Sequence, residues 1–246
     1  MDRLVLWNID LTLMDVGKVA RDALAEAFRQ VTGRPLVALP QLAGRTDTEI
    51  FFESLYLNDV PPAAGEEAEL LSRYGQALVT AFAARRGDLV RGGRLLPGAQ
   101  AAVLAVAELP GVVQTVLTGT IEPNAVCKLQ AFGLDRALDL EIGGYGSDAY
   151  PRGSLLMRVR QQASEKYGGA WSPQTSAGVP AVYIADTERD IEAAEIAGAR
   201  SIAVATGRAT AAELRDAGAD LVFTDLSDTG QVIAAVDKLT TVHASR

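Results

Sequence analysis

Short apolar runs without regular polar alternation recur along the 246-residue chain. A strand that is buried on both faces produces such a run, because neither set of its alternating side chains meets water. The pattern therefore predicts strands of a parallel sheet at Leu4–Trp7, Val112–Leu117, Ala181–Ala185, Ser201–Ala205 and Leu221–Phe223.

Helical patterns lie between these runs, at 101–109, 122–134 and 188–199. Gly133 and Gly198 are expected to end the last two helices, because glycine readily adopts the left-handed conformation that follows a helix. Strands that alternate with helices predict an α/β fold with a doubly wound, Rossmann-like parallel sheet and right-handed crossovers.

Residues 17–91 break this alternation, because only helical patterns occur there. In "GKVARDALAEAFRQVTG", Val19, Ala23, Ala27 and Val31 fall on one helical face. The segments "DTEIFFESLYL" and "EEAELLSRYGQALVTAFAARR" also predict helices, and the Gly- and Pro-bearing "RGGRLLPG" at 91–98 is expected to act as a hinge. We therefore predict an α/β core, residues 1–16 and 92–246, and an inserted all-helical domain, residues 17–91.

Composition narrows the possible classes of protein. Hydrophobic residues make up 48% of the chain, charged residues 22%, and the net charge is −8. This argues for a soluble globular protein and against nonspecific nucleic-acid binding. No apolar run approaches a membrane span and no secretory signal opens the chain, so we expect a cytoplasmic monomer or homodimer without membrane contact. The single cysteine, Cys127, excludes an intrachain disulfide, and the single histidine, His243, is expected to lie in a frayed tail.

Polar residues stand at the ends of three predicted strands. Asn8 and Asp10 follow the first, Thr118 follows the second and Asp186 follows the third. Open α/β sheets bind ligands at the carboxyl ends of their strands. Each residue alone could simply cap a helix or shape a turn. Together they predict an active site on one edge of the sheet.

These segments resemble the motifs of the haloacid-dehalogenase superfamily of hydrolases that carry a helical cap of the first type. "NIDLT" is similar to the first motif, Asp-x-Asp-x-Thr, except that Asn8 stands where the family has its nucleophilic aspartate. "LTGT" supplies the hydroxyl of the second motif at Thr118, and "IADTERD" resembles the fourth motif through Asp186 and Asp190. "AGRTDTEIFFE" resembles a common cap segment and "RLLPGA" the return to the core, so the resemblance covers nearly the whole chain.

The resemblance implies a Mg²⁺-dependent phosphohydrolase that acts on a small phosphorylated metabolite through an aspartyl-phosphate. The first acid of the motif attacks phosphorus, and Asp10 protonates the leaving oxygen and then activates water. Thr118 donates a hydrogen bond to a phosphoryl oxygen. Asp186 binds the metal with support from Asp190, and the implied metal group also includes Asn8 and Asp10.

Other residues bear on the substrate. Relatives that cleave carbon–halogen or carbon–phosphorus bonds usually lack the acid found here at Asp10, so the resemblance favours phosphate monoesters or, as in a phosphomutase, transfer between sugar positions. The candidates for substrate contact are Thr12, Gly119 and Arg45. Thr12 is expected mainly to fix the loop. Arg45 either faces the site from the cap or is an ordinary arginine of a surface turn.

Two residues compete for the cation of the third motif. Lys128 lies two turns inside the helix after Thr118, roughly 10 Å from the edge of the sheet at 1.5 Å per residue, and it could equally belong to a solvated helix face. Arg152 stands where the helix near 153 begins, and an arginine there could hold phosphate with two bonds. We favour Arg152 and retain Lys128 as the second candidate.

Asn8 keeps the shape of aspartate but loses its charge and nearly all of its nucleophilicity. The chain could be a deliberately altered enzyme, a natural relative that only binds a phosphorylated ligand, a protein whose asparagine hydrolyses to aspartate, or an enzyme in which Asp10 directs water without a covalent step. Bulky Ile9 is expected to slow deamidation. The altered enzyme, the natural binder and the direct attack of water all stay open.

Overall fold

The computed structural model describes residues 3–147, 152–168 and 179–241, without the side chains of Arg152 and Gly153. Within these residues one sheet has the strand order β4-β1-β5-β6-β7, and all its neighbours are parallel. The five predicted strands are confirmed. They are β1 (Arg3–Trp7), β4 (Val112–Val116), β5 (Ala181–Ala185), β6 (Arg200–Val204) and β7 (Leu221–Phe223).

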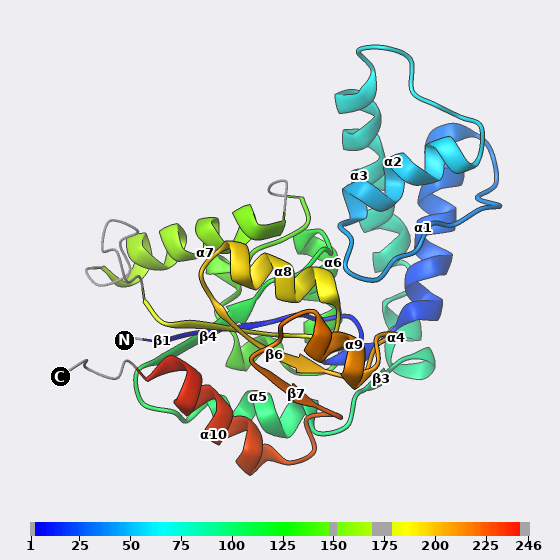
Figure 1. The fold of residues 1–246 in the computed structure, drawn as a ribbon. Coiled ribbons are helices and arrows are strands. Elements are labelled where there is room, and N and C mark those ends of the chain that lie inside the picture. Colours follow the sequence, from blue (N-terminus) through cyan, green and yellow to red (C-terminus); the bar gives the residue numbers. More distant parts are fainter. Residues whose placement is uncertain (1–2, 148–151, 169–178, 242–246) are drawn as a thin grey trace.

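Helices cover both faces of the sheet, as Figure 1 shows. Helices α5 (Ala99–Ala107) and α10 (Thr229–Thr240) pack on one face, and α7 (Arg152–Tyr167) and α8 (Glu188–Ile196) pack on the other. In β1, Val5 and Trp7 join the first apolar cluster, whereas Leu4 and Leu6 join the second. Burial on both faces explains why the strands showed no polar alternation.

The remaining core elements lie toward the edges of the sheet. Helix α6 (Glu122–Ala131) follows β4 and leads into two short 3₁₀ turns, Asp135–Ala137 and Leu140–Ile142, while α9 (Ala211–Asp216) packs beside β6 and β7. Gly133 and Gly198 have φ values of 71° and 64° just beyond α6 and α8. Both helices therefore end at the glycines that the sequence predicted.

The segment of residues 17–92 has helices as its regular elements, as predicted. It contains α1 (Gly17–Thr32), α2 (Asp47–Leu57), α3 (Glu67–Ala83) and α4 (Arg86–Gly92). Helices α1 and α3 pack side by side, and the ring of Phe51 in α2 stacks on Tyr74 in α3 with centroids 3.9 Å apart. Figure 1 shows α1–α3 standing apart from the sheet as a cap.

The connection between cap and core contains a pair of short strands. Strand β2 (Met14–Asp15) pairs in antiparallel fashion with β3 (Arg94–Leu95), so the two crossings of the chain form a small ribbon. Two-residue strands carry no periodic signal, which is why the sequence did not predict them. The proposed boundaries at 16/17 and 91/92 lie beside this ribbon and stay a prediction. Across the described residues, every helix is too short or too polar to cross a bilayer.

Candidate active site

The carboxyl ends of β1, β4 and β5 open into a cavity of about 770 Å³ that lies between the core and the cap. The parallel sheet brings together groups that are far apart in sequence, because these three strands are neighbours. Of the predicted site residues, the cavity is lined by Asn8, Asp10, Arg45, Thr118, Gly119, Lys128 and Asp186.

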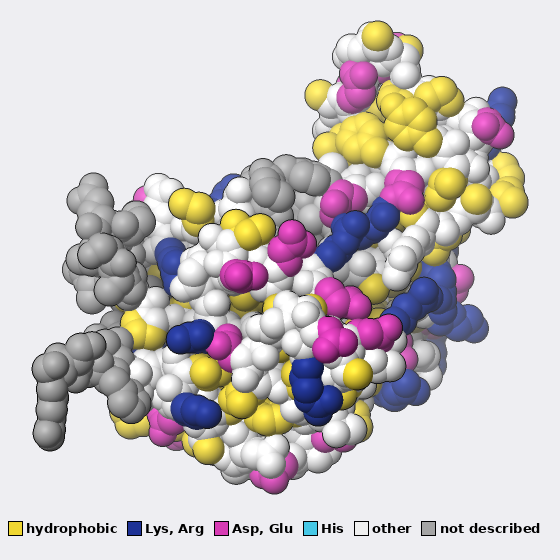
Figure 2. All heavy atoms as spheres, viewed as in Figure 1, with side chains coloured by type: hydrophobic (Ala, Val, Ile, Leu, Met, Phe, Trp, Pro, Cys, Tyr) yellow, Lys and Arg dark blue, Asp and Glu magenta, His cyan; other side chains and the backbone are white. Residues whose placement is uncertain are grey.

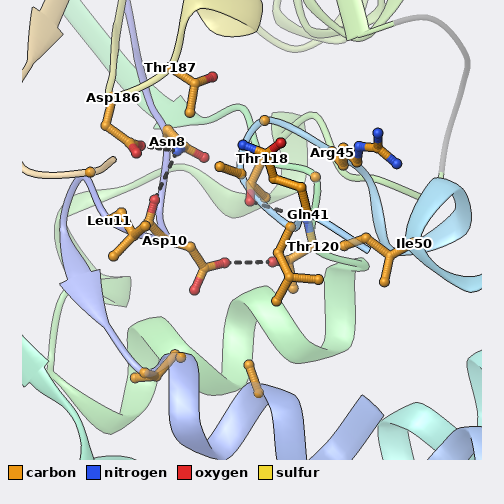
Figure 3. A pocket seen from close by; sticks show the side chains of 18 of the residues that line it. Asn8, Asp10, Leu11, Gln41, Arg45, Ile50, Thr118, Thr120, Asp186 and Thr187 are labelled. Carbon is orange, nitrogen blue, oxygen red and sulfur yellow. Dashed lines mark hydrogen bonds between the residues drawn. The ribbon is translucent and has the colours of Figure 1, made fainter. Parts of the chain in front are cut away.

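Asn8 is the centre of one hydrogen-bonded group, and Figure 3 draws Asn8, Asp10 and Asp186 of this group. Its buried amide nitrogen donates to Asp186 Oδ1 at 2.9 Å, to the backbone oxygen of Asp10 at 3.1 Å and to Thr12 Oγ1 at 3.3 Å. The Thr12 hydroxyl also donates to Asp186 Oδ1 at 2.8 Å. Thr12 is not among the residues that line the cavity, and these bonds fit its predicted role of fixing the loop. The neutral amide therefore helps to satisfy the buried Asp186 carboxylate.

The turn that follows Asn8 has an unusual backbone. Leu11 has a backbone φ of 60°, a value that residues other than glycine rarely adopt. Its carbonyl oxygen accepts a 2.6 Å bond from the hydroxyl of Thr206, and its N–H donates to Met14. These contacts hold Leu11 in a costly conformation, and such conformations cluster at functional sites.

Asp10 belongs to a second group, which includes a buried cation. Lys128 Nζ donates to Asp10 Oδ2 at 2.5 Å and to Thr120 Oγ1 at 3.0 Å, and the Thr120 hydroxyl donates to Asp10 Oδ2 at 3.0 Å. The Lys128 side chain is only 4% exposed, and its ammonium lies 5.6 Å from the ring centroid of Phe82 in the cap. The Lys128 ammonium thus places a positive charge at the carboxyl ends of the strands, in the wall of the cavity.

The sequence argument against Lys128 was therefore mistaken in two respects. The side chain reaches the cavity because helical side chains lean toward the N-terminus of their helix, while the Asp10 side chain extends to meet it. A solvated helix face is also wrong, because Lys128 is buried. The favoured residue, Arg152, begins α7, but its side chain lies outside the described residues.

Asp190 lies behind the cavity rather than in its wall. Its carboxylate accepts from the Tyr183 hydroxyl at 3.0 Å and from the Thr187 hydroxyl at 2.6 Å, and the residue has no exposed surface. Thr187 is the N-cap of α8 and follows Asp186 directly. Asp190 thus holds the loop that presents Asp186, which suits a supporting role better than direct ligation.

Three polar cap residues that the sequence did not predict also line the cavity: Arg21, Gln41 and Asp47. Asp47 lines the cavity, and its Oδ2 accepts from the Ile121 N–H at 2.9 Å. Burial against the core raises the pKa of Asp47 to about 6. Gln41 also lines the cavity, and its amide points into the pocket in Figure 3, without a hydrogen-bond partner in the described parts of the chain. A local signal existed only for Asp47, since "TDTE" at 46–49 forms the capping box that begins α2.

Arg45 lines the cavity, but its guanidinium forms an ion pair with Glu53 of α2. Figure 3 shows the guanidinium turned away from Asn8. The backbone of Arg45 lies against Gly119, where an added Cβ would collide with the Arg45 carbonyl oxygen. Glycine at 119 therefore permits the close approach of cap and core.

Some of the groups around Asn8 have oxygen atoms that suit a hard divalent cation, and others do not. Asp186 offers a carboxylate and Asp10 a backbone oxygen, but the Asn8 amide presents nitrogen to both and must turn over to present its oxygen. The Asp10 carboxylate instead faces Lys128. Among residues with described placement, no cluster of three or more Asp, Glu, His or Cys side chains could hold a metal. One carboxylate together with ligand phosphate is nevertheless a common way of holding Mg²⁺.

The chain thus combines a parallel α/β core, a helical insertion after the first strand and a polar cavity at the strand ends. The family model described as haloacid dehalogenase-like hydrolase matches residues 5–195, and one described as HAD-hydrolase-like matches residues 163–229. The chain therefore belongs to the haloacid dehalogenase-like hydrolase family. No curated protein matches it.

Solved structures share the fold over nearly the whole chain. A hydrolase from Pseudomonas syringae has 18% identity and a TM-score of 0.63, covering 98% of this chain and 100% of its own. A predicted phosphatase from Clostridium acetobutylicum has 16% identity and a TM-score of 0.63, with coverage of 96% and 99%. CbbY from Rhodobacter sphaeroides, solved with phosphate, has 21% identity and a TM-score of 0.59, with coverage of 94% and 97%. These identities establish likeness of fold.

Proposed function

We propose that the protein is a phosphohydrolase scaffold that binds a small phosphorylated metabolite, and that Asn8 impairs its turnover. The main support for this proposal is the cavity at the strand ends. Residues from separate parts of the chain line it together: Asn8, Asp10, Thr118, Lys128 and Asp186. The phosphate found with CbbY, whose fold this chain shares, agrees with a phosphorylated ligand. A cytoplasmic location and a monomeric or homodimeric state belong to the same proposal.

Each residue has a defined part in this proposal. The Lys128 ammonium offsets phosphate charge, and its bond to Asp10 holds that carboxyl in the cavity. Asp10 passes a proton to the leaving oxygen and afterwards takes one from water. Thr118 and the Gly119 backbone, which line the cavity, donate hydrogen bonds to a phosphoryl oxygen in this proposal. With Asn8 in place of aspartate, attack on phosphorus by this side chain is lost.

Mg²⁺ belongs to the proposal as the cofactor. Asp186, the turned Asn8 amide and the Asp10 backbone oxygen are the groups that would hold it, and the ion would supply positive charge against the phosphate. Aspartate at position 8 would add a second carboxylate to this set. The present chain is therefore expected to hold the cation more loosely than its Asn8→Asp variant.

The main alternative is a catalytically silent protein that binds a phosphorylated ligand. One observation favours it: the Asn8 amide nitrogen donates to Asp186, Thr12 and the Asp10 backbone, so an asparagine is accommodated at this position. An aspartate-to-asparagine mutant of CbbY was solved with xylulose-(1,5)bisphosphate, which agrees with ligand binding after such a change in that protein. Phosphate transfer between sugar positions is a further reaction that the same site could perform.

Phosphate release distinguishes these functions. The chain and its Asn8→Asp variant are assayed with Mg²⁺ against a panel of phosphorylated metabolites, and Asn8→Asp with Asp186→Ala serves as the inactive control. We expect Asn8→Asp to exceed the unchanged chain by at least about a thousandfold on its best substrate, because a covalent route opens.

Release by the Asn8→Asp variant alone supports an impaired scaffold. Binding of the panel without release by either version supports the silent binder. If neither version binds or hydrolyses any phosphorylated compound, the proposed function is wrong.

A further inference from the structure

Asp47 of the cap forms hydrogen bonds with the core residues on both sides of Thr120. The N–H of Asp47 donates to the Gly119 carbonyl oxygen at 2.8 Å, and the Asp47 carboxylate accepts from the Ile121 N–H at 2.9 Å. Asp47 is the first residue of α2 in the cap, whereas residues 118–121 connect β4 to α6 in the core. We call this pair of bonds the Asp47 clasp.

Thr120, between the two clasped residues, connects this loop to the charged pair of the cavity. Its hydroxyl donates to Asp10 and accepts from Lys128, each at 3.0 Å. Its N–H donates to the Thr118 hydroxyl at 3.2 Å. A shift of the clasped loop would therefore move partners of Asp10, Lys128 and Thr118 together.

Cap and core approach each other closely around the Asp47 clasp, at positions where only glycine fits. A Cβ at Gly119 would strike the Arg45 carbonyl, and one at Gly146 would strike the Gly119 carbonyl. The Thr48 hydroxyl, one residue after Asp47, donates to the Gly146 oxygen at 3.4 Å. The loop of residues 118–121 is thus held between the cap and Gly146.

Ion pairs add to this contact. Figure 2 shows basic and acidic side chains side by side where the cap meets the core. One pair joins Arg189 of α8 to Glu49 of α2 at 3.7 Å, although both side chains are partly exposed and such pairs contribute little. The clasp differs from this pair because its two hydrogen bonds involve backbone groups of the active-site loop.

We propose that Asp47 is a positioning residue through which cap docking fixes the loop of residues 118–121 and, through Thr120, the Asp10–Lys128 pair. The inference deepens the proposed function and rests on it for the identity of the site. Docking by the cap would then complete the phosphate-binding arrangement rather than merely cover it. A phosphorylated ligand held by this arrangement would in turn favour the docked cap.

The same geometry makes docking sensitive to pH. Burial in the docked state is the main reason that the pKa of Asp47 rises from 3.8 to about 6, and Asp10 also raises it, whereas Lys128 and the Ile121 N–H lower it. Tyr74 of α3 also faces Asp47, and burial, with Asp47 as a further cause, raises the pKa of Tyr74 well above its usual value. Tyr74 therefore stays neutral across the range in which Asp47 titrates.

The direction of the pH dependence of docking is set by the state in which Asp47 holds its proton more tightly. The docked cap favours neutral Asp47, so docking is strongest below pH 4, weakens as the pH rises through 4 to 6 and is constant above about 7. Protonation of Asp47 therefore shifts the equilibrium toward the docked cap. A neutral carboxyl still accepts the Ile121 bond through its carbonyl oxygen.

Hydrogen exchange of the Ile121 amide tests the clasp without any need for turnover. The protection factor is measured from pH 4.5 to 7.5 on the full chain, on Asp47→Ala and Asp47→Asn, and on Asp22→Asn as a control acid exposed on α1. Binding of inorganic phosphate by the same proteins is the second readout.

We expect Asp47→Ala to lower Ile121 protection by about tenfold and to weaken phosphate binding, because a backbone donor loses its partner. Asp47→Asn keeps an acceptor, so protection should persist while its dependence on pH disappears. Asp22→Asn should behave as the unchanged chain. If Asp47→Ala does not fold, Asp47→Asn decides through the pH dependence.

Unchanged Ile121 protection in Asp47→Ala, or an unchanged pH dependence in Asp47→Asn, overturns the proposal. Failure of the proposed function has a different signature, since an Asn8→Asp variant without phosphatase activity leaves the exchange result intact. Loss of protection without any change in phosphate binding would reduce Asp47 to a structural contact and would also overturn the positioning role.

Discussion

The two walls of the cavity are built differently. On the core wall the polar side chains bind one another: Asn8 to Asp186, and Lys128 to Asp10. The cap wall has more aliphatic than polar side chains. Its polar side chains are those of Arg21, Gln41, Arg45 and Asp47, and within the described residues Arg21 and Gln41 have no hydrogen-bond or ion-pair partner. The aliphatic side chains of the cap wall are those of Ala20, Leu24, Leu39, Pro40, Leu42, Ala43 and Ile50.

This difference separates the two tasks of the site. An interlocked polar wall is suited to a charged group of fixed shape, because its donors and carboxylates are already oriented. An aliphatic wall excludes water and accepts organic groups with less directional demand. We therefore expect changes in the core to alter chemistry for every substrate, and changes in the cap to alter the ranking of substrates.

The largest effect should come from the buried cation of the core wall. In the Asn8→Asp background, Lys128→Ala should lower kcat/KM by roughly a hundredfold or more for all substrates, because it removes phosphate-facing charge and leaves Asp10 without its partner. Steady-state phosphate release measures this, with circular dichroism to verify folding.

Arg152→Ala in the same background is the matched comparison, because Arg152 was the favoured cation in the sequence. A loss confined to Lys128→Ala assigns the third-motif role to Lys128. A large loss in Arg152→Ala with little change in Lys128→Ala would reverse this assignment and the description of the core wall.

A second, intermediate effect concerns Mg²⁺. Asn8→Asp should increase the Mg²⁺-dependent rise in melting temperature by several degrees, because a carboxylate replaces an amide beside Asp186 and tighter binding stabilises the folded state by mass action. Asp186→Ala should abolish the response in both backgrounds. Thermal unfolding across a Mg²⁺ titration measures it.

In this titration, the Asp190→Asn variant tests whether Asp190 binds the metal or only supports the loop that carries Asp186. Because Asp190 is bonded to Tyr183 and Thr187 behind the cavity, its variant should melt earlier but keep most of the Mg²⁺ response. An equal response in the unchanged chain and Asn8→Asp would show that position 8 does not face the metal, and our interpretation of the first motif would then fail.

The smallest effect should come from the cap wall. Gln41→Ala should change the relative affinity for two organic phosphates by about three- to tenfold, because one hydrogen bond to the organic part is lost, while inorganic phosphate binds as before. Isothermal titration gives both affinities.

Arg45→Ala is the companion variant, since the sequence nominated Arg45 for substrate choice. It should also change substrate ranking and spare inorganic phosphate, although its ion pair with Glu53 limits the effect. Equal losses for all ligands, phosphate included, would count against a selective role for either cap residue.

Local sequence was sufficient for most of the fold. The five apolar runs predicted β1, β4, β5, β6 and β7, because burial on both faces of a parallel sheet leaves a signature in consecutive residues. The glycines at 133 and 198 marked helix ends for an equally local reason, a left-handed backbone. The ribbon of β2 and β3 left no trace, since two-residue strands have no period.

The sequence indicated some residues of the candidate site and not others. The difference is whether a residue follows a strand or reaches the cavity through the packing of a helix. Asn8, Asp10, Thr118 and Asp186 could be found because each follows a strand, and the sheet topology requires neighbouring strand ends to meet. That Lys128 reaches the cavity could not be judged from its distance along a helix. That depended on where α6 lies and on which way the Asp10 side chain extends.

The sequence by itself determined the parallel core, the helical insertion and the residues at the strand ends, because periodicity and strand order are properties of the chain. Only the tertiary structure decided that Asp47 meets Gly119 and Ile121, that Arg45 turns to Glu53 and that Gln41 faces the cavity. The contacts of Asp47 with Gly119 and Ile121 join segments more than 70 residues apart and depend on how the cap packs on the core. No local pattern encodes that placement.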